Sequence, residues 1–284
     1  GNIFLMSLEQ YFPTGATAVD AFVDSFFKQI STNEKYSIFF AYKKYASILN
    51  SIKRECKQTI RDIICEQDNS NFKIGQVESY VGGKNVLFEF GGRKIAFGGI
   101  VDRIDRYNNK VIVVDYKTGK AEHEIEDIIF GNKIQIFVYL KTLEETRGVE
   151  AVGALYYPIS AKRKKKNQKT FLGFLVEDEL DAFDKTLRQE GCSKALGVKL
   201  KKDGTLSSNK TVISRQEFSN LMNIAKSVME QNLKNISEGF ISPSPLNTGK
   251  LPCEYCKFLG ICKFDSDGGN KYRMLRKVEK QENE

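Results

Sequence analysis

Apolar and polar positions along the chain follow two different periods, and the change between them divides the sequence. From Tyr36 to Gln67, apolar residues recur at spacings of three and four, which predicts one long helix carrying a single apolar stripe. We expect this stripe to be buried; its members are Phe39, Tyr42, Tyr45, Ile48, Leu49, Ile52, Cys56, Ile60 and Ile63. From about residue 72, short apolar runs separated by Gly-Gly or Asn-Asn turn signals are typical of strands.

The second half of the chain alternates between the two patterns. A helix is predicted from about Glu124 to Glu145, strands over 151–160 and 170–176, and two further helices near 178–190 and 214–238. Helices, then antiparallel strands, then helix, strand and helices make a mixed α/β (α+β) domain, with a mixed central sheet flanked by helices.

The same patterns divide the chain into four expected parts. They are a helical part over 1–70, a core over 71–240, a cysteine-rich segment over 241–265 and a charged tail over 266–284. Because the chain begins with Gly inside an amphipathic pattern, we interpret it as a fragment of a longer protein.

Composition narrows the class of protein only a little. Hydrophobic residues make up 41% of the 284 positions, which is enough for a core. No apolar run approaches the ~18 residues that indicate a membrane-spanning helix. The formal net charge of +8 suits a polyanionic partner, but it serves solubility equally well.

The six cysteines are unevenly distributed. Three are isolated, whereas Cys253, Cys256 and Cys262 crowd together with the spacing C-x₂-C-x₅-C. This layout favours a metal site over a disulfide framework, and a reducing compartment inside the cell.

Two strands in the middle of the chain bring like charges together. If Asn108-Asn109 is a two-residue hairpin loop, Asp102 lies opposite Asp115, and Lys117 falls on the same face as Asp115. Directly opposed like charges destabilise a sheet, and a divalent cation such as Mg²⁺ would remove the conflict. The alternative is an ordinary sheet face on which Lys117 neutralises Asp115. A slip of one residue in register would place the two carboxylates on opposite faces.

Asp105 falls on the other face of this hairpin. It lies beside Arg103 and Arg106 there, so we expect it to form a structural ion pair.

The residues of this hairpin and of the helix after it resemble a known family. The stretch "GGIVDRIDRYNNKVIVVDYKTGK", followed by "QIFVY", is similar to the RecB-type branch of the PD-(D/E)xK nucleases. Family members pair a G-x-x-D strand with a (D/E)-x-K strand and carry Q-x-x-x-Y on a helix. Here the motifs are Gly99 to Asp102, Asp115-Tyr116-Lys117, and Gln135 with Tyr139.

The resemblance implies a restriction-endonuclease-like core and Mg²⁺- or Mn²⁺-dependent hydrolysis of DNA. It implies that Asp102, Asp115 and the Tyr116 carbonyl bind the metal and that Lys117 positions water. It also implies that Gln135 and Tyr139 hold the scissile strand. Glu78 is a weaker candidate for a further acidic ligand, its alternative being an exposed strand carboxylate.

The segment "PCEYCKFLGIC" extends the resemblance. It is similar to the end of the nuclease domain in the B subunit of AddAB (RexAB) helicase–nucleases and in related CRISPR-associated exonucleases. This implies that Cys253, Cys256 and Cys262 join a distant N-terminal cysteine around a 4Fe–4S cluster that staples the domain. Zinc is the physical rival. Because the upstream cysteine is missing here, we expect an empty or incomplete site.

The sequence departs from the family at Leu5, where relatives have a metal-binding histidine, and His123 does not fit that role. One alternative is therefore a weakened or inactive nuclease fold that only binds a DNA strand. A second is an interaction domain stabilised by zinc or a cluster.

A basic run adds a candidate phosphate contact, although a solvated loop is an equal reading; its residues are Lys162, Arg163, Lys164, Lys165 and Lys166. No sequence-reading motif is present, so we expect sequence-tolerant binding of single-stranded DNA. The resemblance further implies an exonuclease in the bacterial cytoplasm, an AddA-like partner subunit, and a role in double-strand break repair and recombination.

Overall fold

The structure, a computed structural model, is organised around one mixed sheet. It describes residues 16–82, 88–90, 93–118, 125–159, 171–247, 249 and 251–274. The sheet has six strands in the order β1-β4-β5-β6-β7-β10, with β5/β6 and β7/β10 parallel and the other neighbours antiparallel. The bounds of these strands are Lys73–Gly82 (β1), Gly98–Tyr107 (β4), Lys110–Lys117 (β5), Glu150–Pro158 (β6), Leu172–Val176 (β7) and Val212–Ile213 (β10). The mixed α/β architecture that the sequence predicts is therefore confirmed.

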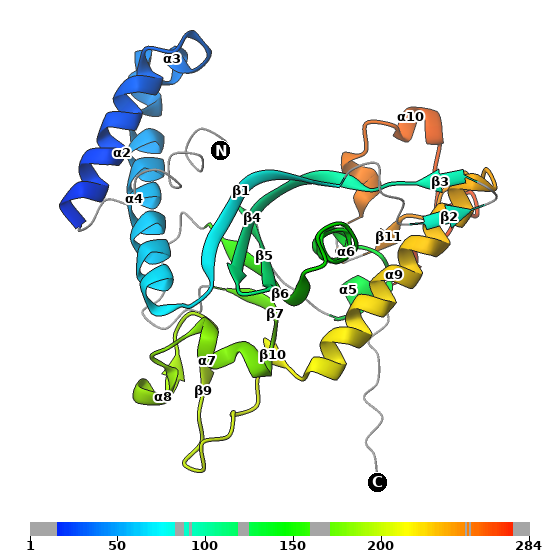
Figure 1. The fold of residues 1–284 in the computed structure, drawn as a ribbon. Coiled ribbons are helices and arrows are strands. Elements are labelled where there is room, and N and C mark those ends of the chain that lie inside the picture. Colours follow the sequence, from blue (N-terminus) through cyan, green and yellow to red (C-terminus); the bar gives the residue numbers. More distant parts are fainter. Residues whose placement is uncertain are drawn as a thin grey trace.

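Helices cover both faces of the sheet (Figure 1). The pair α2 (Ala16–Ser31) and α4 (Ala46–Asn69) runs beside β1, with α3 (Glu34–Ala41) and the short η1 (Lys43–Tyr45) at its far end. On the other face, α6 (Gln135–Arg147) lies beneath the curve of β1 and β4, and α5 (Ile125–Ile129) and α9 (Arg215–Ser237) lie beyond it. None of the described helices is long and apolar enough to span a membrane.

Short elements complete the described part of the chain. They are β2 (Phe88–Phe90), β3 (Arg93–Ile95), η2 (Glu177–Glu179), α7 (Leu180–Phe183), α8 (Leu187–Glu190), β8 (Cys192–Ser193), β9 (Val198–Lys199), β11 (Leu246–Asn247), η3 (Pro252–Tyr255), α10 (Leu259–Cys262) and β12 (Arg273–Met274).

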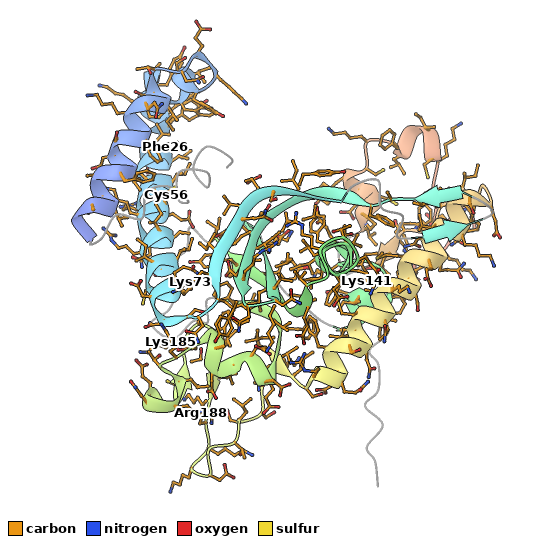
Figure 2. The ribbon with its side chains drawn as sticks, viewed as in Figure 1. Phe26, Cys56, Lys73, Lys141, Lys185 and Arg188 are labelled. Carbon is orange, nitrogen blue, oxygen red and sulfur yellow. The ribbon has the colours of Figure 1, made fainter. Side chains whose placement is uncertain are left out.

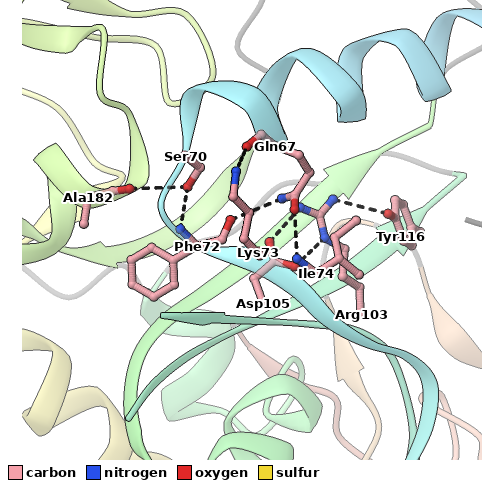
Figure 3. Close-up of polar contacts among 9 residues, drawn as sticks. All are labelled: Gln67, Ser70, Phe72, Lys73, Ile74, Arg103, Asp105, Tyr116 and Ala182. Atoms are coloured by element: carbon pink, nitrogen blue, oxygen red, sulfur yellow. Dashed lines mark hydrogen bonds and ion pairs between the residues drawn. The ribbon is translucent and has the colours of Figure 1, made fainter. Parts of the chain in front are cut away.

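Two hydrophobic clusters hold these layers together. The larger one fills the space between the sheet and α6 with α9, where Ile104, Phe137 and Leu140 are fully buried. The smaller one joins α2 and α4 to β1 through Val23, Ile60 and Val77, with Phe26 and Cys56 packed at its edge (Figure 2). A polar contact fixes the corner between α4 and β1, because Gln67 accepts the N–H of Ile74 at 2.8 Å (Figure 3).

The prediction of a single helix over 124–145 is wrong. This segment forms two helices, α5 and α6, separated by a turn in which Gly131 has a φ of +72°. Buried Asp127 holds this turn: its carboxylate accepts Asn132 Nδ2 at 2.8 Å and Lys133 Nζ at 2.7 Å, and its carbonyl accepts the N–H of Asn132 at 2.8 Å. Aspartate contacts of this kind compete with the helical hydrogen bonds, and they end α5 here.

The helix predicted near 178–190 is likewise broken into η2, α7 and α8. Asp184 Oδ1 accepts the N–H of Thr186 at 3.1 Å between the last two, so a local side-chain contact again replaces a helical one. The helix predicted near 214–238 is confirmed as α9, which begins with a capping box between Ser214 and Glu217.

The long amphipathic helix predicted from Tyr36 is also interrupted, because Tyr42 is extended between α3 and η1. The predicted stripe is buried only in its second half, at Ile60 and Ile63. In its first half, Phe39, Tyr42, Ile48 and Ile52 are exposed, because no described element covers that end of the pair.

A buried ion pair lies between the sheet and α4. Arg103 donates to Asp105 twice, from Nε at 2.7 Å and from Nη2 at 2.6 Å, and both side chains are almost completely buried (Figure 3). The structural ion pair expected for Asp105 is therefore confirmed, with Arg103 as its partner. Removing one member of such a pair strongly destabilises the fold, because the other member is then left as an uncompensated buried charge.

We therefore expect Asp105→Ala to lower the free energy of unfolding by about 3–5 kcal/mol, measured by urea denaturation. The matched control is Asp181→Ala, which removes an equally bidentate contact to Arg188 at 2.8 and 3.0 Å in which both side chains are more than half exposed. This control should cost no more than about 1 kcal/mol. Equal losses in the two variants would contradict the importance of the buried pair.

Candidate active site

The β4–β5 hairpin has the register that the sequence predicts. Asn108 and Asn109 form the turn, with Asn108 in the left-handed region at a φ of +52°, and Tyr107 pairs with Lys110 next to it. Asn tolerates this conformation better than most residues, and a tight turn fixes the register of both strands. The ladder continues along the hairpin and ends with the pair Arg103 and Val114.

Beyond that pair, β4 and β5 separate. Asp102 and Asp115 do not form a ladder pair; instead, Asp102 Oδ2 accepts the backbone N–H of Tyr116 at 2.8 Å. The next part of β4 stays paired with β1, where Val101 lies opposite Ser79. The separation opens a fork between the strands, and Asp102 and Asp115 both lie at this fork.

The electrostatics of the fork show that both carboxylates share one environment. Burial raises the pKa of Asp102, and the negative charge of Asp115 raises it further, while the N–H of Tyr116 and the ammonium of Lys117 lower it. Asp115 Oδ2 forms an ion pair with Lys117 Nζ at 2.6 Å. This buried oxygen nevertheless has no partner in hydrogen-bond geometry within the described ranges.

The carboxylate oxygens of the fork are suitable ligands for a hard divalent cation. A Mg²⁺ ion is bound through one or two carboxylates, with water and substrate phosphate oxygens as its other ligands. Asp102 and Asp115 supply the carboxylates, and Asp115 Oδ2 is a buried acceptor with capacity to spare. Within the described residues no group of three or more His, Cys, Asp or Glu side chains is placed to hold a metal. A cation here would therefore depend on backbone carbonyl, water and substrate oxygens as well.

Lys117 has an apolar neighbour in addition to Asp115. Its Nζ lies 5.5 Å from the centroid of the Tyr156 ring, and its side chain remains 40% exposed. Burial raises the pKa of Tyr156, and the negative charge of Asp115 adds to this effect. Tyr156 and Tyr157 are both buried and belong to the hydrophobic core.

The ring of Tyr116 is not placed to stack on a base. Its ring packs on the α4 side of the sheet, 5.4 Å from the ring of Tyr157. Its hydroxyl accepts Arg103 Nη1 at 3.5 Å (Figure 3). The backbone of Tyr116 thus faces the fork while its side chain is held behind it.

Helix α6 brings the Q-x-x-x-Y residues to the G-x-x-D strand. Gln135 Nε2 donates to the hydroxyl of Tyr139 at 2.7 Å, so the two side chains act as a unit on one helix face. A Cβ atom at Gly99 would lie 2.8 Å from Tyr139 Cε1 and 2.9 Å from its hydroxyl. Glycine is required at this position because the tyrosine ring lies directly on the strand backbone.

Glu78 lies close to the fork in an unusual conformation. The pairs on either side of it, Val77 with Arg103 and Ser79 with Val101, place it opposite Asp102 across β1 and β4. Its φ is +44°, which is costly for a residue with a side chain and is typical of functional sites. Burial and the negative charge of Asp102 raise its pKa. Its role as a ligand stays a prediction.

Asp127 is a residue that the sequence analysis did not single out. By ending α5, it sets the point at which α6 begins and therefore the placement of Gln135. The signal was present in "GNK" at 131–133, because Gly followed by Asn is typical of a turn rather than of a helix interior.

The three clustered cysteines are not arranged as a metal site. Cys253 is half-buried, whereas Cys256 and Cys262 are exposed. Among the described residues, these cysteines do not form a group of three or more side chains that could hold a metal ion. Three thiols by themselves are one ligand short of a four-thiolate cluster, and their role as cluster ligands stays a prediction. Leu5, His123 and the basic residues Lys162–Lys166 lie outside the residues that the structure describes.

Comparison with known proteins places this geometry in a family. A family model described as the PD-(D/E)XK nuclease superfamily matches residues 6–263. The chain is also similar to proteins named as the B-type subunits of ATP-dependent helicase/deoxyribonucleases. It is 28% identical to the one from Clostridium acetobutylicum over 87% of this chain and 24% of the relative. It is 26% identical to the one from Clostridium tetani over 90% and 25%, and 30% identical to the one from Clostridium kluyveri over 65% and 18%.

The chain thus spans about a quarter, or less, of the length of the curated relatives it matches. The family model, by contrast, covers most of this chain, and the restriction-endonuclease-like fold expected from the sequence is confirmed. With its G-x-x-D and D-x-K residues on one forked hairpin and its Q-x-x-x-Y helix against that hairpin, this protein belongs to the PD-(D/E)XK nuclease superfamily.

Proposed function

We propose that this chain is a metal-dependent nuclease domain that hydrolyses phosphodiester bonds in DNA. The observation that carries the proposal is the fork, in which Asp102 and Asp115 share one half-buried environment with the ammonium of Lys117 beside them. The word "deoxyribonuclease" in the names of the relatives supports DNA as the substrate.

In this proposal, Asp102, Asp115 and the carbonyl of Tyr116 hold Mg²⁺ or Mn²⁺, with Glu78 as a further carboxylate. When bound, the metal lowers the pKa of a coordinated water and stabilises charge on the phosphate. Lys117 is partly exposed and keeps its ammonium at the fork, where it orients the attacking water or a phosphate oxygen.

In the same proposal, α6 positions the DNA strand. The amide of Gln135 and the hydroxyl of Tyr139 form one polar unit that contacts β4 at Gly99. This unit is placed to hold the scissile strand against the fork. Lys162–Lys166 would add phosphate contacts that carry no sequence information.

The proposed setting follows from the relatives, which are parts of a helicase–nuclease. We propose that the chain acts with an AddA-like partner as an exonuclease on single-stranded DNA, in double-strand break repair and recombination in the bacterial cytoplasm.

The same proposal divides the chain into four parts. Residues 1–70 would be the helical part, 71–240 the nuclease core, 241–265 the cysteine staple and 266–284 a charged tail. Cys253, Cys256 and Cys262 would join a 4Fe–4S cluster only with a further ligand from outside the described residues.

The decisive experiment compares cleavage of single-stranded DNA by the chain and by Asp115→Asn, with Mn²⁺ supplied. Loss of a metal ligand should exceed the 10–100-fold cost of losing a residue that supports one, so kcat/KM should fall by more than ~100-fold. Binding of Mn²⁺ should weaken in the same variant, measured by titration calorimetry.

The control for this experiment is Asp181→Asn, an exposed carboxylate on α7 paired with Arg188, which should cleave as the unchanged chain does. If the chain binds DNA but neither it nor the variants cleave, the nuclease proposal is wrong. The chain is then the inactive DNA-binding fold that Leu5 suggests.

A second prediction concerns the contact between α6 and β4. Gly99→Ala places a methyl group against the Tyr139 ring, so the ring must move, and we expect KM for DNA to rise several-fold with little change in Mn²⁺ binding. In a double-mutant cycle, adding Gly99→Ala to Tyr139→Ala should have almost no further effect.

Gly260→Ala is the matched control, because no atom lies within 4 Å of a Cβ at that position. It should leave cleavage unchanged. Additive effects of the two substitutions at Gly99 and Tyr139 would show that the contact between ring and strand does not position the substrate.

A further inference from the structure

The far end of the α2–α4 pair exposes aromatic rings. We define the helical tip as residues 34–54, which comprise α3, η1 and the first turns of α4. Phe39 is 44% exposed and Tyr42 is 56% exposed. Both rings contact the ring of Tyr45 edge-on, at 5.3 and 6.5 Å between centroids, so the three rings form one group. A contiguous group of exposed rings is typical of an interaction site.

The charges of the helical tip are almost all positive. Its one acidic residue is Glu34, at the start of α3, and its basic residues are Lys35, Lys43, Lys44, Lys53 and Arg54. Lys44 lies over the aromatic group, with its Nζ 4.9 Å from the Tyr45 centroid and 5.7 Å from the Tyr42 centroid.

Carboxylates do not neutralise the outermost lysines. Lys53 pairs with Asp24 at 2.9 Å, but among the described residues Lys35, Lys43 and Lys44 have no carboxylate within ion-pair distance. Their positive charge is therefore available to an anion. Lysine is depleted from the cores of protein–protein interfaces, so three lysines without carboxylate partners favour an anionic partner for this surface.

We propose that the helical tip binds single-stranded DNA, with lysines on the phosphates and the rings of Phe39 and Tyr42 against bases. Surfaces that bind single strands without sequence preference combine positive charge with aromatic side chains, and a stacked base must be free of a partner strand. The inference rests on the proposed function for the identity of the polyanion, but it does not depend on cleavage.

The helical tip lies at a distance from the fork. In α4, Ile60 and Ile63 are buried against the sheet, and the helix continues past the sheet edge to the tip (Figure 1). At 1.5 Å per residue, the helix between Tyr45 and Ile60 spans about 20 Å. A long strand can therefore occupy the tip as well as the fork, whereas a short oligonucleotide that sits in the fork does not reach the tip.

The test measures the affinity of the whole chain for fluorescent oligothymidines of increasing length, by anisotropy without added metal. We expect the double substitution Lys43→Glu with Lys44→Glu to weaken binding of long strands by more than ~10-fold at low salt. It should also reduce the salt dependence by roughly 0.7 for each phosphate that the tip no longer neutralises. Tyr42→Ala should weaken long-strand binding by about tenfold, the effect of losing one stacked base. Short strands should bind all variants equally.

The matched control is Lys201→Glu with Lys202→Glu, which makes the same change in net charge in an exposed loop after β9, at the opposite end of the view (Figure 1). Circular dichroism checks that every variant is folded. Equal weakening by this control would show a general charge effect and overturn the proposal. Long-strand binding unchanged by the tip substitutions would also overturn it, and would leave the tip as a surface for a protein partner.

The outcome separates this inference from the proposed nuclease activity. If the tip variants lose affinity for long strands and neither the unchanged chain nor any variant cleaves DNA, the helical tip binds DNA and the nuclease proposal fails. If the chain cleaves short oligonucleotides and the tip variants bind long strands normally, the nuclease proposal holds and this inference fails.

Discussion

The hydrogen bond from the backbone N–H of Tyr116 to the carboxylate of Asp102 is the interaction on which the candidate site depends. It occupies the position where a ladder bond would otherwise join β4 and β5. The strands therefore separate there, and Asp102 and Asp115 face a common space. Two half-buried carboxylates in one environment are costly, and the ammonium of Lys117 balances only one of the two charges. The charge that is left over is the physical argument for a metal-dependent function.

Different elements pack against the two faces of the hairpin. Behind the fork, the buried pair of Arg103 and Asp105 lies between the sheet and α4, and the ring of Tyr116 packs beside it. In front of the fork, Tyr139 of α6 lies directly on the backbone at Gly99. The strand that carries Asp102 is thus held from both sides. This arrangement places the carboxylates on a rigid element, which a site that positions a phosphate requires.

Sequence reasoning was successful where the physical cause is local. The register of β4 and β5 follows from a two-residue Asn turn and from alternation along the strands, and the helix α9 follows from its periodicity. It failed where a side chain interrupts a periodic pattern. Asp127 ends α5 through contacts to Asn132 and Lys133, which an apolar periodicity does not detect.

The sequence by itself determined the hairpin, its acidic residues and the family motifs, because each depends on residues close together along the chain. Only the tertiary structure decided how those residues are used. It joined Asp102 to the backbone N–H of Tyr116 in place of a ladder bond, gave Glu78 a left-handed backbone opposite Asp102, and brought α6 onto Gly99. It also left the first half of an apolar stripe exposed. The physical reason is that periodicity shows which face of an element is apolar, whereas burial depends on whether a distant segment covers that face.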